Sequence, residues 1–262
     1  MGLKTINMQK KKLLFIVNPI SGGKQKKDLP SLIHQYLDAR LFQYEILYTD
    51  YEGHGAGLAR KHKDEFDILV AVGGDGTINE IAKELQASST AMAIIPFGSG
   101  NGLSRFLKIP LKAKEAILAL NSGDYTKIDT AMLNQHFFVS IAGVGFDSLI
   151  AAEFAKAPTR GFETYAKLSL QQYASYKEQE YYITINEETI KRKAVMISFA
   201  NSDQFGYNTR IAPQANISDG LIEVCILRKP KLYQIPILMQ QIGPQKRRNP
   251  SFWKLLELIN CA

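Results

Sequence analysis

The segment Gly73–Thr77 (GGDGT) combines three glycines with one carboxylate at the point where an apolar run ends. Residues 66–72 (FDILVAV) are typical of a buried strand, and apolar residues then recur with helical spacing from Ile78 to Leu85. Glycines between a strand and a helix leave backbone N–H groups open to an anion, most often phosphate. Asp75 would repel a phosphate unless a divalent cation lay between them or the carboxylate took a proton. We therefore predict a nucleotide-phosphate loop in which Asp75 acts through a metal ion.

This motif alone has a second interpretation, a tight turn between strand and helix in which Asp75 is a solvated turn residue. The segment is not a Walker A loop, because it lacks Gly-Lys-Ser/Thr, and it lacks the third glycine of the dinucleotide fingerprint. Thr77 and Glu80 have the spacing of a capping box. We therefore predict that Thr77 is the N-cap of the following helix.

Two more glycine-rich loops follow apolar strands. Asn18–Lys24 follows a predicted strand at 13–17, and Pro96–Gly102 follows one at 91–95. Parallel strands end at a common edge of their sheet, and in open sheets ligands bind at that edge. Three such loops favour a nucleotide cleft over three unrelated turns. His54 has no carboxylate or cysteine at metal-ligand spacing, so we expect a loop or cap residue there.

The sequence pattern changes near residue 127. Long stretches with helical spacing of apolar residues come before it, and β-rich segments follow. We predict an α/β domain with a parallel-type sheet over residues 1–127 and an antiparallel β-rich sandwich domain over 128–262. The second domain has a mostly helical stretch from 147 to 176. Its predicted strands are 127–133, 136–141, 181–186, 194–200 and 221–227.

Composition limits the class of protein. The 262 residues are 45% hydrophobic, which suits a globular protein with a substantial core. Two cysteines are too few for a disulfide framework, and the apolar run at 13–17 is too short for a signal peptide or membrane span. A net charge of +7, spread over both halves, suits an anionic lipid surface or a polyphosphate better than nucleic acid. A merely soluble basic protein remains the alternative.

Five segments, in order along the chain, resemble the diacylglycerol kinase catalytic family, which includes bacterial lipid kinases, sphingosine kinases and ceramide kinases. The segments are Asn18–Gly22, Gly73–Glu80, Pro96–Asn101, Gly143–Asp147 and Asp219–Gly220. NAD kinases share the glycine-aspartate motif, but the Asn-Pro-x-Ser-Gly start and the Gly-Ser-Gly-Asn loop favour the lipid branch. The resemblance implies an NAD kinase/diacylglycerol kinase-like fold. It also implies ATP- and Mg²⁺-dependent phosphorylation of a hydroxyl of diacylglycerol, a sphingoid base or a similar lipid.

The resemblance also implies roles for individual residues. The positions that correspond to nucleotide contacts are Asn18, Pro19, Ile20, Ser21, Gly22, Thr49, Gly73, Gly74, Asp75, Gly76, Thr77, Asn79, Glu80, Ser99, Gly100 and Asn101. The implied catalytic acids are Asp75, which would help to hold Mg²⁺ through water, and Asp147, which would contact metal-bound water or substrate. Asp219, with the carbonyls of Asn216 and Leu221, matches a structural metal site of oxygen ligands. From spacing alone, a β-turn is the stronger interpretation of Asp219.

The sequence departs from the family at two places. Gly102 follows Asn101, where many bacterial members have an aspartate, and no Asp-Gly-Glu motif precedes Ala262. In the family the glutamate of that motif is proposed as the base. We therefore expect a C-terminally incomplete second domain, or another acid in that role. Loss of the base would cost about 10²–10⁴-fold in rate, not all activity. A non-catalytic nucleotide- or lipid-binding relative and an NAD kinase-like enzyme are the alternatives.

The implied partner is a lipid at a membrane surface, and no nucleic acid is expected. The low cysteine content agrees with a cytoplasmic location. We expect peripheral association with the inner face of the membrane. A homodimer is left open.

Overall fold

The computed structural model describes residues 9–23, 26–159, 161–185, 187–235, 238 and 256–261. The chain divides into two compact units. Unit 1 comprises Met1–Gly98 and Leu107–Thr126, and unit 2 comprises Ser99–Phe106 and Lys127–Ala262. We expected residues 99–106 in the first domain. They group instead with unit 2, because α4 (Gly102–Phe106) packs against β11 (Gln204–Gly206), where a Cβ at Gly102 would lie 2.9 Å from the Gln204 carbonyl oxygen.

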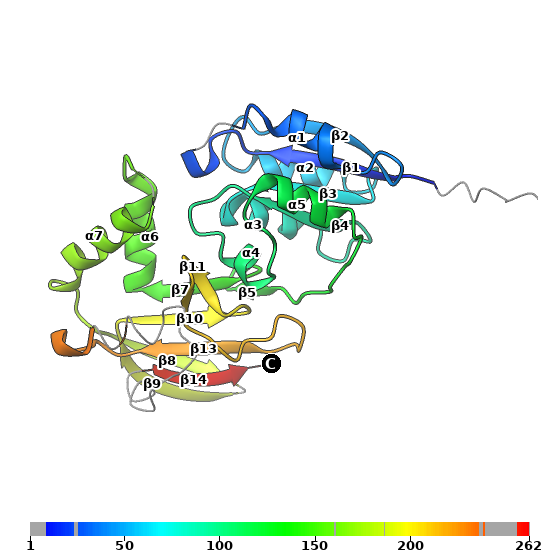
Figure 1. The fold of residues 1–262 in the computed structure, drawn as a ribbon. Helices are drawn as coiled ribbons and strands as arrows, with labels where there is room; N and C mark the ends of the chain where they lie inside the picture. Colours follow the sequence, from blue (N-terminus) through cyan, green and yellow to red (C-terminus); the bar gives the residue numbers. More distant parts are fainter. Residues whose placement is uncertain are drawn as a thin grey trace, which may run out of the picture. The chain divides into compact units, whose positions relative to one another are not determined.

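Unit 1 is built on a four-stranded parallel sheet in the order β2-β1-β3-β4 (Figure 1). The strands are β1 (Lys11–Val17), β2 (Phe42–Tyr48), β3 (Ile68–Gly73) and β4 (Ala91–Pro96). All of β3, and β1 from residue 13 onward, are buried. Central strands of a parallel sheet are covered on both faces, so their sequences are continuous apolar runs. The predicted α/β fold with a parallel sheet is confirmed.

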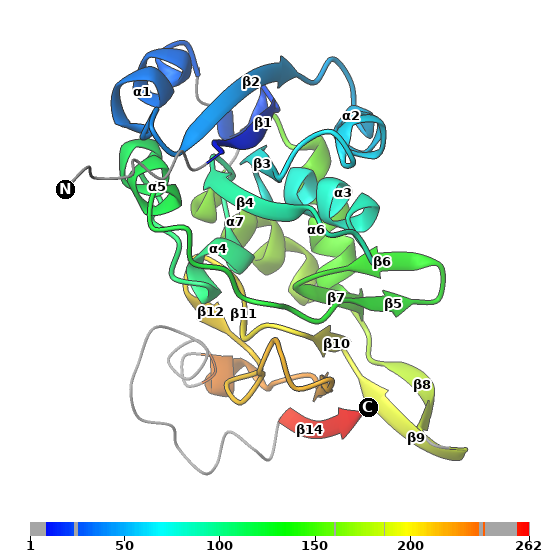
Figure 2. The same ribbon diagram turned by 90° about the vertical axis from the view of Figure 1, so that its right-hand side faces the viewer.

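Four helices cover the two faces of this sheet (Figure 2). The helices α1 (Leu29–Tyr36) and α5 (Ala113–Leu120) lie on one face, and α2 (His54–His62) and α3 (Asp75–Glu84) lie on the other. Ile33 of α1 and Ile117 of α5 are fully buried in a core with Phe15 and Val70. This core fixes the strand ends that carry the glycine-rich loops.

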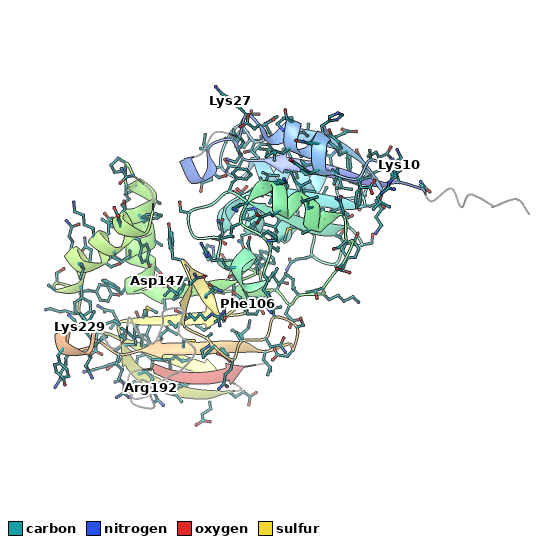
Figure 3. All side chains as sticks on the ribbon, viewed as in Figure 1. Lys10, Lys27, Phe106, Asp147, Arg192 and Lys229 are labelled. Atoms are coloured by element: carbon teal, nitrogen blue, oxygen red, sulfur yellow. The ribbon has the colours of Figure 1, made fainter. Side chains whose placement is uncertain are left out.

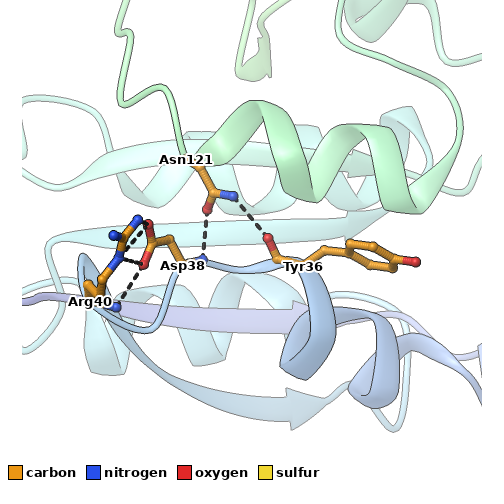
Figure 4. A network of polar contacts seen from close by, with 4 residues as sticks. All are labelled: Tyr36, Asp38, Arg40 and Asn121. Carbon is orange, nitrogen blue, oxygen red and sulfur yellow. Dashed lines mark hydrogen bonds and ion pairs between the residues drawn. The ribbon is translucent and has the colours of Figure 1, made fainter.

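A polar cluster joins the ends of α1 and α5 (Figure 4). The Asn121 side chain accepts a hydrogen bond from the Asp38 backbone N–H at 3.0 Å and donates one to the Tyr36 carbonyl at 2.9 Å. Arg40 pairs with the Asp38 carboxylate at 2.6 Å and holds the pKa of that carboxyl at about 2. The cluster satisfies backbone groups that the end of α1 leaves open.

Unit 2 is built on an antiparallel sheet in the order β14-β13-β10-β7. Its strands are β7 (Ile141–Gly145), β10 (Met196–Ala200), β13 (Ile222–Leu227) and β14 (Leu256–Cys261). Short hairpins pair β5 (Ala131–Leu133) with β6 (His136–Phe138), β8 (Gln179–Ile185) with β9 (Glu188–Ala194), and β11 with β12 (Thr209–Arg210). The helices α6 (Phe146–Lys156) and α7 (Phe162–Tyr173) follow β7. The predicted antiparallel β-rich region is confirmed.

Some predicted strand boundaries in unit 2 are wrong. The strand expected at 194–200 is divided, because β9 ends at Ala194 and β10 begins at Met196 in a different sheet. The strand expected at 127–133 is limited to 131–133. The first residues of the expected strand make a different hydrogen bond, because the Asp129 N–H donates to the Ile217 carbonyl at 2.7 Å. Within the described part of the chain, no helix has both the length and the apolar character needed to cross a membrane.

Candidate functional site

The loops of unit 1 that the sequence singled out lie at the carboxyl ends of its parallel strands. Asn18–Gly22 follows β1, Thr49 follows β2, Gly74–Thr77 follows β3, and Phe97–Gly98 follows β4. Backbone hydrogen bonds continue the sheet into these loops. Examples are Asn18 N–H to the Val72 carbonyl at 3.0 Å, Thr49 N–H to Val17 at 2.9 Å and Phe97 N–H to Gly73 at 2.7 Å. The sheet therefore presents these loops along one edge of unit 1.

The loops after β1 and β4 touch at a glycine. Gly22 has φ +67°, and a Cβ there would lie 1.9 Å from the Phe97 carbonyl oxygen. The loop after β3 also approaches the loop after β4, since a Cβ at Gly74 would lie 3.0 Å from the Cα of Gly98. The backbones of the three loops are therefore closely packed. A residue larger than glycine does not fit at position 22, and the space at position 74 is tight.

Asn18 connects the loop after β1 to α3. Its Oδ1 accepts a hydrogen bond from the Ile20 N–H at 3.1 Å, and its Nδ2 donates to Thr77 Oγ1 at 3.2 Å. The prediction that Thr77 is an N-cap is wrong. The helix begins at Asp75 with Gly74 as N-cap and no side-chain cap, and the Thr77 hydroxyl faces Asn18 instead.

Glu80 does not complete a capping box either. Its Oε1 accepts a hydrogen bond from the Gly53 N–H at 3.2 Å, at the start of α2. A Cβ at Gly55 would lie 2.8 Å from Glu80 Oε2, so the carboxylate packs against that helix. His54 is the first residue of α2, and its Nδ1 accepts a hydrogen bond from the Asp50 N–H at 3.0 Å.

Asp75 occupies the first turn of α3 and is half-buried. The amino end of a helix attracts negative charge through its free N–H groups and the helix dipole. A carboxylate and a phosphate at the same helix end repel one another unless a cation is shared between them. Asn79 is half-buried on the same helix, and a Cβ at Gly76 would meet no atom within 4 Å. The space beside Gly76, in the first turn, is therefore open.

Lys26 contributes to the site although its sequence context gave no sign of it. Its side chain is only 7% exposed, and its Nζ donates to the carbonyls of Ser21 at 3.0 Å and Pro19 at 3.3 Å. The ammonium lies 5.0 Å from the ring centroid of Phe97, and burial lowers the pKa of Lys26 to about 8. Lys26 therefore ties the loop after β1 to the loop after β4. The lysine within the predicted loop, Lys24, lies outside the described residues.

The later part of the third predicted loop (Pro96–Gly102), Ser99–Asn101, belongs to unit 2 and is held in place there. Arg105 Nε donates to the Gly100 carbonyl at 3.0 Å, and its Nη1 donates to Asn208 Oδ1 at 3.1 Å. Gly206 has φ +125°, and a Cβ there would lie 2.8 Å from the Cα of Gly100. The β11–β12 hairpin therefore fixes the backbone of this loop, which no local sequence signal indicated.

Asp147 lies in the first turn of α6, in unit 2 (Figure 3). Its Oδ1 accepts a hydrogen bond from the Tyr165 hydroxyl of α7 at 2.7 Å. Burial raises the pKa of Asp147, an effect that the Tyr165 hydrogen bond opposes, and burial also raises the pKa of Tyr165. The pair combines a carboxyl of raised pKa with a fixed hydroxyl donor.

The Asp219 segment forms a compact turn with a second carboxylate beside it. Asp219 Oδ1 accepts a hydrogen bond from the Leu221 N–H at 3.0 Å, and Asn216 Oδ1 accepts one from Ser218 at 3.2 Å. The Gly220 N–H donates to Asp129 Oδ2 at 2.7 Å. Asp129 was not among the predicted site residues, because it is 91 residues from Gly220.

The described residues contain no group of three or more His, Cys, Asp or Glu side chains able to share a metal. A cation at the Asp219 turn would therefore depend on backbone carbonyls beside one or two carboxylates. That oxygen donor set fits a hard cation such as Mg²⁺ or Ca²⁺.

Two family comparisons cover most of the chain. Residues 12–133 match the diacylglycerol kinase catalytic domain, and residues 140–244 match the YegS C-terminal NAD kinase beta sandwich-like domain. Residues 12–133 belong to the diacylglycerol kinase catalytic-domain family. The first match contains the loops after β1, β3 and β4, and the second contains Asp147 and the Asp219 turn.

Individual relatives of the chain are named diacylglycerol kinases as well. The chain is 25% identical over 237 residues to a diacylglycerol kinase of Staphylococcus saprophyticus, covering 88% of this chain and 77% of that protein. It is 27% identical over 232 residues to the Bacillus subtilis diacylglycerol kinase, and the match covers 85% of this chain and 75% of that protein. The crystal structure of a diacylglycerol kinase from Bacillus anthracis has the same fold, with a TM-score of 0.72 at 21% identity, over 96% of this chain and 84% of that one.

Proposed function

We propose that this protein is an ATP- and Mg²⁺-dependent lipid kinase that phosphorylates a hydroxyl of diacylglycerol or a similar lipid. The observation that carries the proposal is the close packing of three glycine-rich loops at the edge of the unit 1 sheet. Gly22 meets the Phe97 carbonyl, Gly74 approaches Gly98, and Asn18 joins the first loop to α3. Backbone N–H groups at such an edge, next to a helix amino end, favour the phosphates of a nucleotide.

In this proposal the loops after β1 and β3 hold the triphosphate, and Asp75 is the acid that holds Mg²⁺ beside it. An Mg²⁺ ion held by Asp75 would supply positive charge next to the phosphoryl group that is transferred. Lys26 keeps the first loop in shape by donating to the Pro19 and Ser21 carbonyls. Phosphoryl transfer through a loose transition state depends mainly on positioning and charge stabilisation, which these residues would supply.

Asp147 is the proposed contact for the acceptor hydroxyl or for metal-bound water. Its raised pKa and its bond to Tyr165 would keep the carboxyl oriented and able to exchange a proton. Asp219, with the Asn216 and Leu221 carbonyls, is proposed to hold a structural cation that stabilises the turn. We also propose peripheral contact of this basic protein, of net charge +7, with an anionic membrane surface.

The proposal is tested by phosphate transfer from labelled ATP to lipid acceptors in mixed micelles. We expect a labelled lipid product from diacylglycerol or a sphingoid base, dependent on Mg²⁺. The match of residues 140–244 to an NAD kinase-like domain favours one second candidate, an enzyme that phosphorylates NAD, so NAD is included as an acceptor. Labelling of NAD and of no lipid would replace the proposal. Tight ATP binding without transfer to any acceptor would indicate a non-catalytic relative.

A further inference from the structure

The most exposed large apolar side chains of unit 1 lie in the loops that follow two adjacent strands. Among the described residues of this unit, Ile20 is 84% exposed and Tyr51 is 68% exposed. Ile20 is in the loop after β1, and Tyr51 lies three residues beyond the end of β2. The two strands are paired in parallel, so both loops stand at the carboxyl-terminal edge of the sheet. Single exposed apolar residues are common, but two at the candidate nucleotide edge indicate a ligand with an apolar surface.

The segment that carries Tyr51 is attached at both of its ends to elements of the candidate nucleotide site. The Thr49 N–H donates to the Val17 carbonyl at 2.9 Å, at the end of β1. The Gly53 N–H donates to Glu80 Oε1 at 3.2 Å, on α3. Tyr51 therefore lies between an attachment to β1 and an attachment to α3, whose ends carry two of the glycine-rich loops.

The Tyr51 ring is supported on one face by His54. The two rings are stacked, with centroids 4.6 Å apart and planes inclined by 4°. The His54 N–H donates to the Tyr51 carbonyl at 3.2 Å, and His54 Nδ1 accepts a hydrogen bond from the Asp50 N–H at 3.0 Å. The His54 side chain is 21% exposed. His54 therefore covers one face of the Tyr51 ring and fixes its orientation, while the other face is open to solvent.

We propose that the exposed face of Tyr51 stacks with the base of the nucleotide whose phosphates the glycine-rich loops hold. This inference rests on the proposed nucleotide site and adds to it a residue that was not among the predicted contacts. Removing an aromatic ring that stacks on a base weakens binding by roughly 5- to 150-fold. A ring that is already oriented, as His54 orients this one, loses little freedom when the base binds. Because every base has a π-face, Tyr51 would add affinity without selecting among bases.

The test measures the binding of two probes to the full chain by calorimetry in the presence of Mg²⁺. ATP carries a base, whereas inorganic triphosphate has only the phosphates. The variants are Tyr51→Ala, which removes the ring, and Tyr51→Phe, which keeps it. The matched control is Tyr125→Ala, since Tyr125 is a tyrosine of unit 1 that is 54% exposed. Its hydroxyl accepts a hydrogen bond from Lys11 Nζ at 2.8 Å, at the amino end of β1 and thus at the opposite edge of the sheet.

We expect Tyr51→Ala to bind ATP at least about tenfold more weakly than the wild type and to bind triphosphate within about twofold of it. Tyr51→Phe and Tyr125→Ala should stay within about threefold of the wild type for ATP. If triphosphate binds too weakly to measure, the difference between Tyr51→Ala and Tyr51→Phe decides. Unfolding curves check that each variant is folded. If Tyr51→Ala unfolds, Tyr51→Leu, which keeps an apolar group beside His54, replaces it.

Three results would overturn the stacking and leave the proposed nucleotide site in place. They are wild-type ATP affinity in Tyr51→Ala, equal losses for ATP and triphosphate in that variant, and an equal loss of ATP affinity in Tyr125→Ala. A wild type that binds no ATP would overturn both the stacking and the proposed nucleotide site.

Discussion

At the residue scale, the candidate nucleotide site depends on backbone proximity that only glycine permits. Gly22 combines a positive φ with a neighbouring carbonyl where a Cβ would stand. Glycine adopts that backbone region freely, whereas an L-residue is strained there. A Cβ at Gly57, in the middle of α2, would meet no atom closer than 4.0 Å, and the φ of Gly57 is not positive. Position 22 therefore requires glycine, whereas position 57 has room for a Cβ and a backbone conformation that alanine adopts.

We predict that Gly22→Ala weakens ATP binding by at least tenfold and destabilises unit 1 by about 1–3 kcal/mol, because the loop after β1 must move away from Phe97. Gly57→Ala serves as the control, with unchanged ATP binding and a small gain in stability from its better helix propensity. Calorimetric titration and urea unfolding measure the two effects. Equal ATP affinity in both variants would contradict the role given to the Gly22 contact.

Asp147 leads to a prediction about pH. Because burial raises its pKa in the folded state, the folded protein keeps a proton that the unfolded chain releases near pH 3.8. Stability from this group is present below pH 3.8 and is lost as pH rises through the folded pKa. Asp147→Asn should therefore be more stable than the wild type at pH 8, by about 1 kcal/mol, with the difference vanishing towards pH 4.

The control for that prediction is Glu153→Gln, since Glu153 lies on the same helix and pairs with Lys156 at the surface. Urea unfolding at several pH values between 4 and 8 gives both free energies. A stability difference for Asp147→Asn that did not change with pH would contradict the assignment of the penalty to the buried carboxylate.

At the element scale, long apolar strands were predictable and loop partners were not. The runs of β1 and β3 predict buried parallel strands because both faces of the sheet are covered. Thr77 was misassigned because a capping box is a local pattern, whereas its true partner, Asn18, is 59 residues away. The bond between Asp129 and Gly220 spans 91 residues, so local spacing carries no trace of it. Only two residues separate Ser99–Asn101 from the end of β4 in the sequence, yet the β11–β12 hairpin fixes it.

Lys26 is the element-scale link whose loss can be measured. We predict that Lys26→Met keeps unit 1 folded but weakens ATP binding about tenfold, equivalent to about 1.4 kcal/mol, because two carbonyls of the loop after β1 lose their donor. Lys27→Met, at an exposed neighbouring position, is the matched control and should bind ATP as the wild type does. Lys26→Arg, which keeps donors in place, should recover part of the affinity. Equal affinity of Lys26→Met and Lys27→Met would rule out the proposed link.

At the scale of the whole molecule, the two units carry different parts of the proposed chemistry. Unit 1 carries the loops for a nucleotide and Asp75, and unit 2 carries Asp147 and the Asp219 turn. The change of sequence pattern near residue 127 indicated the division into an α/β part and a β-rich part.

The most direct test of the central claim is the rate of phosphate transfer by Asp75→Asn, with Asp64→Asn, an exposed acid of the same unit, as its control. We predict that Asp75→Asn lowers kcat by at least about 10²-fold, because it removes a charge that holds Mg²⁺, and unfolding curves check that the variant is folded. Asp64→Asn should transfer phosphate at the wild-type rate. An Asp75→Asn protein that phosphorylates lipid as fast as the wild type would contradict the account.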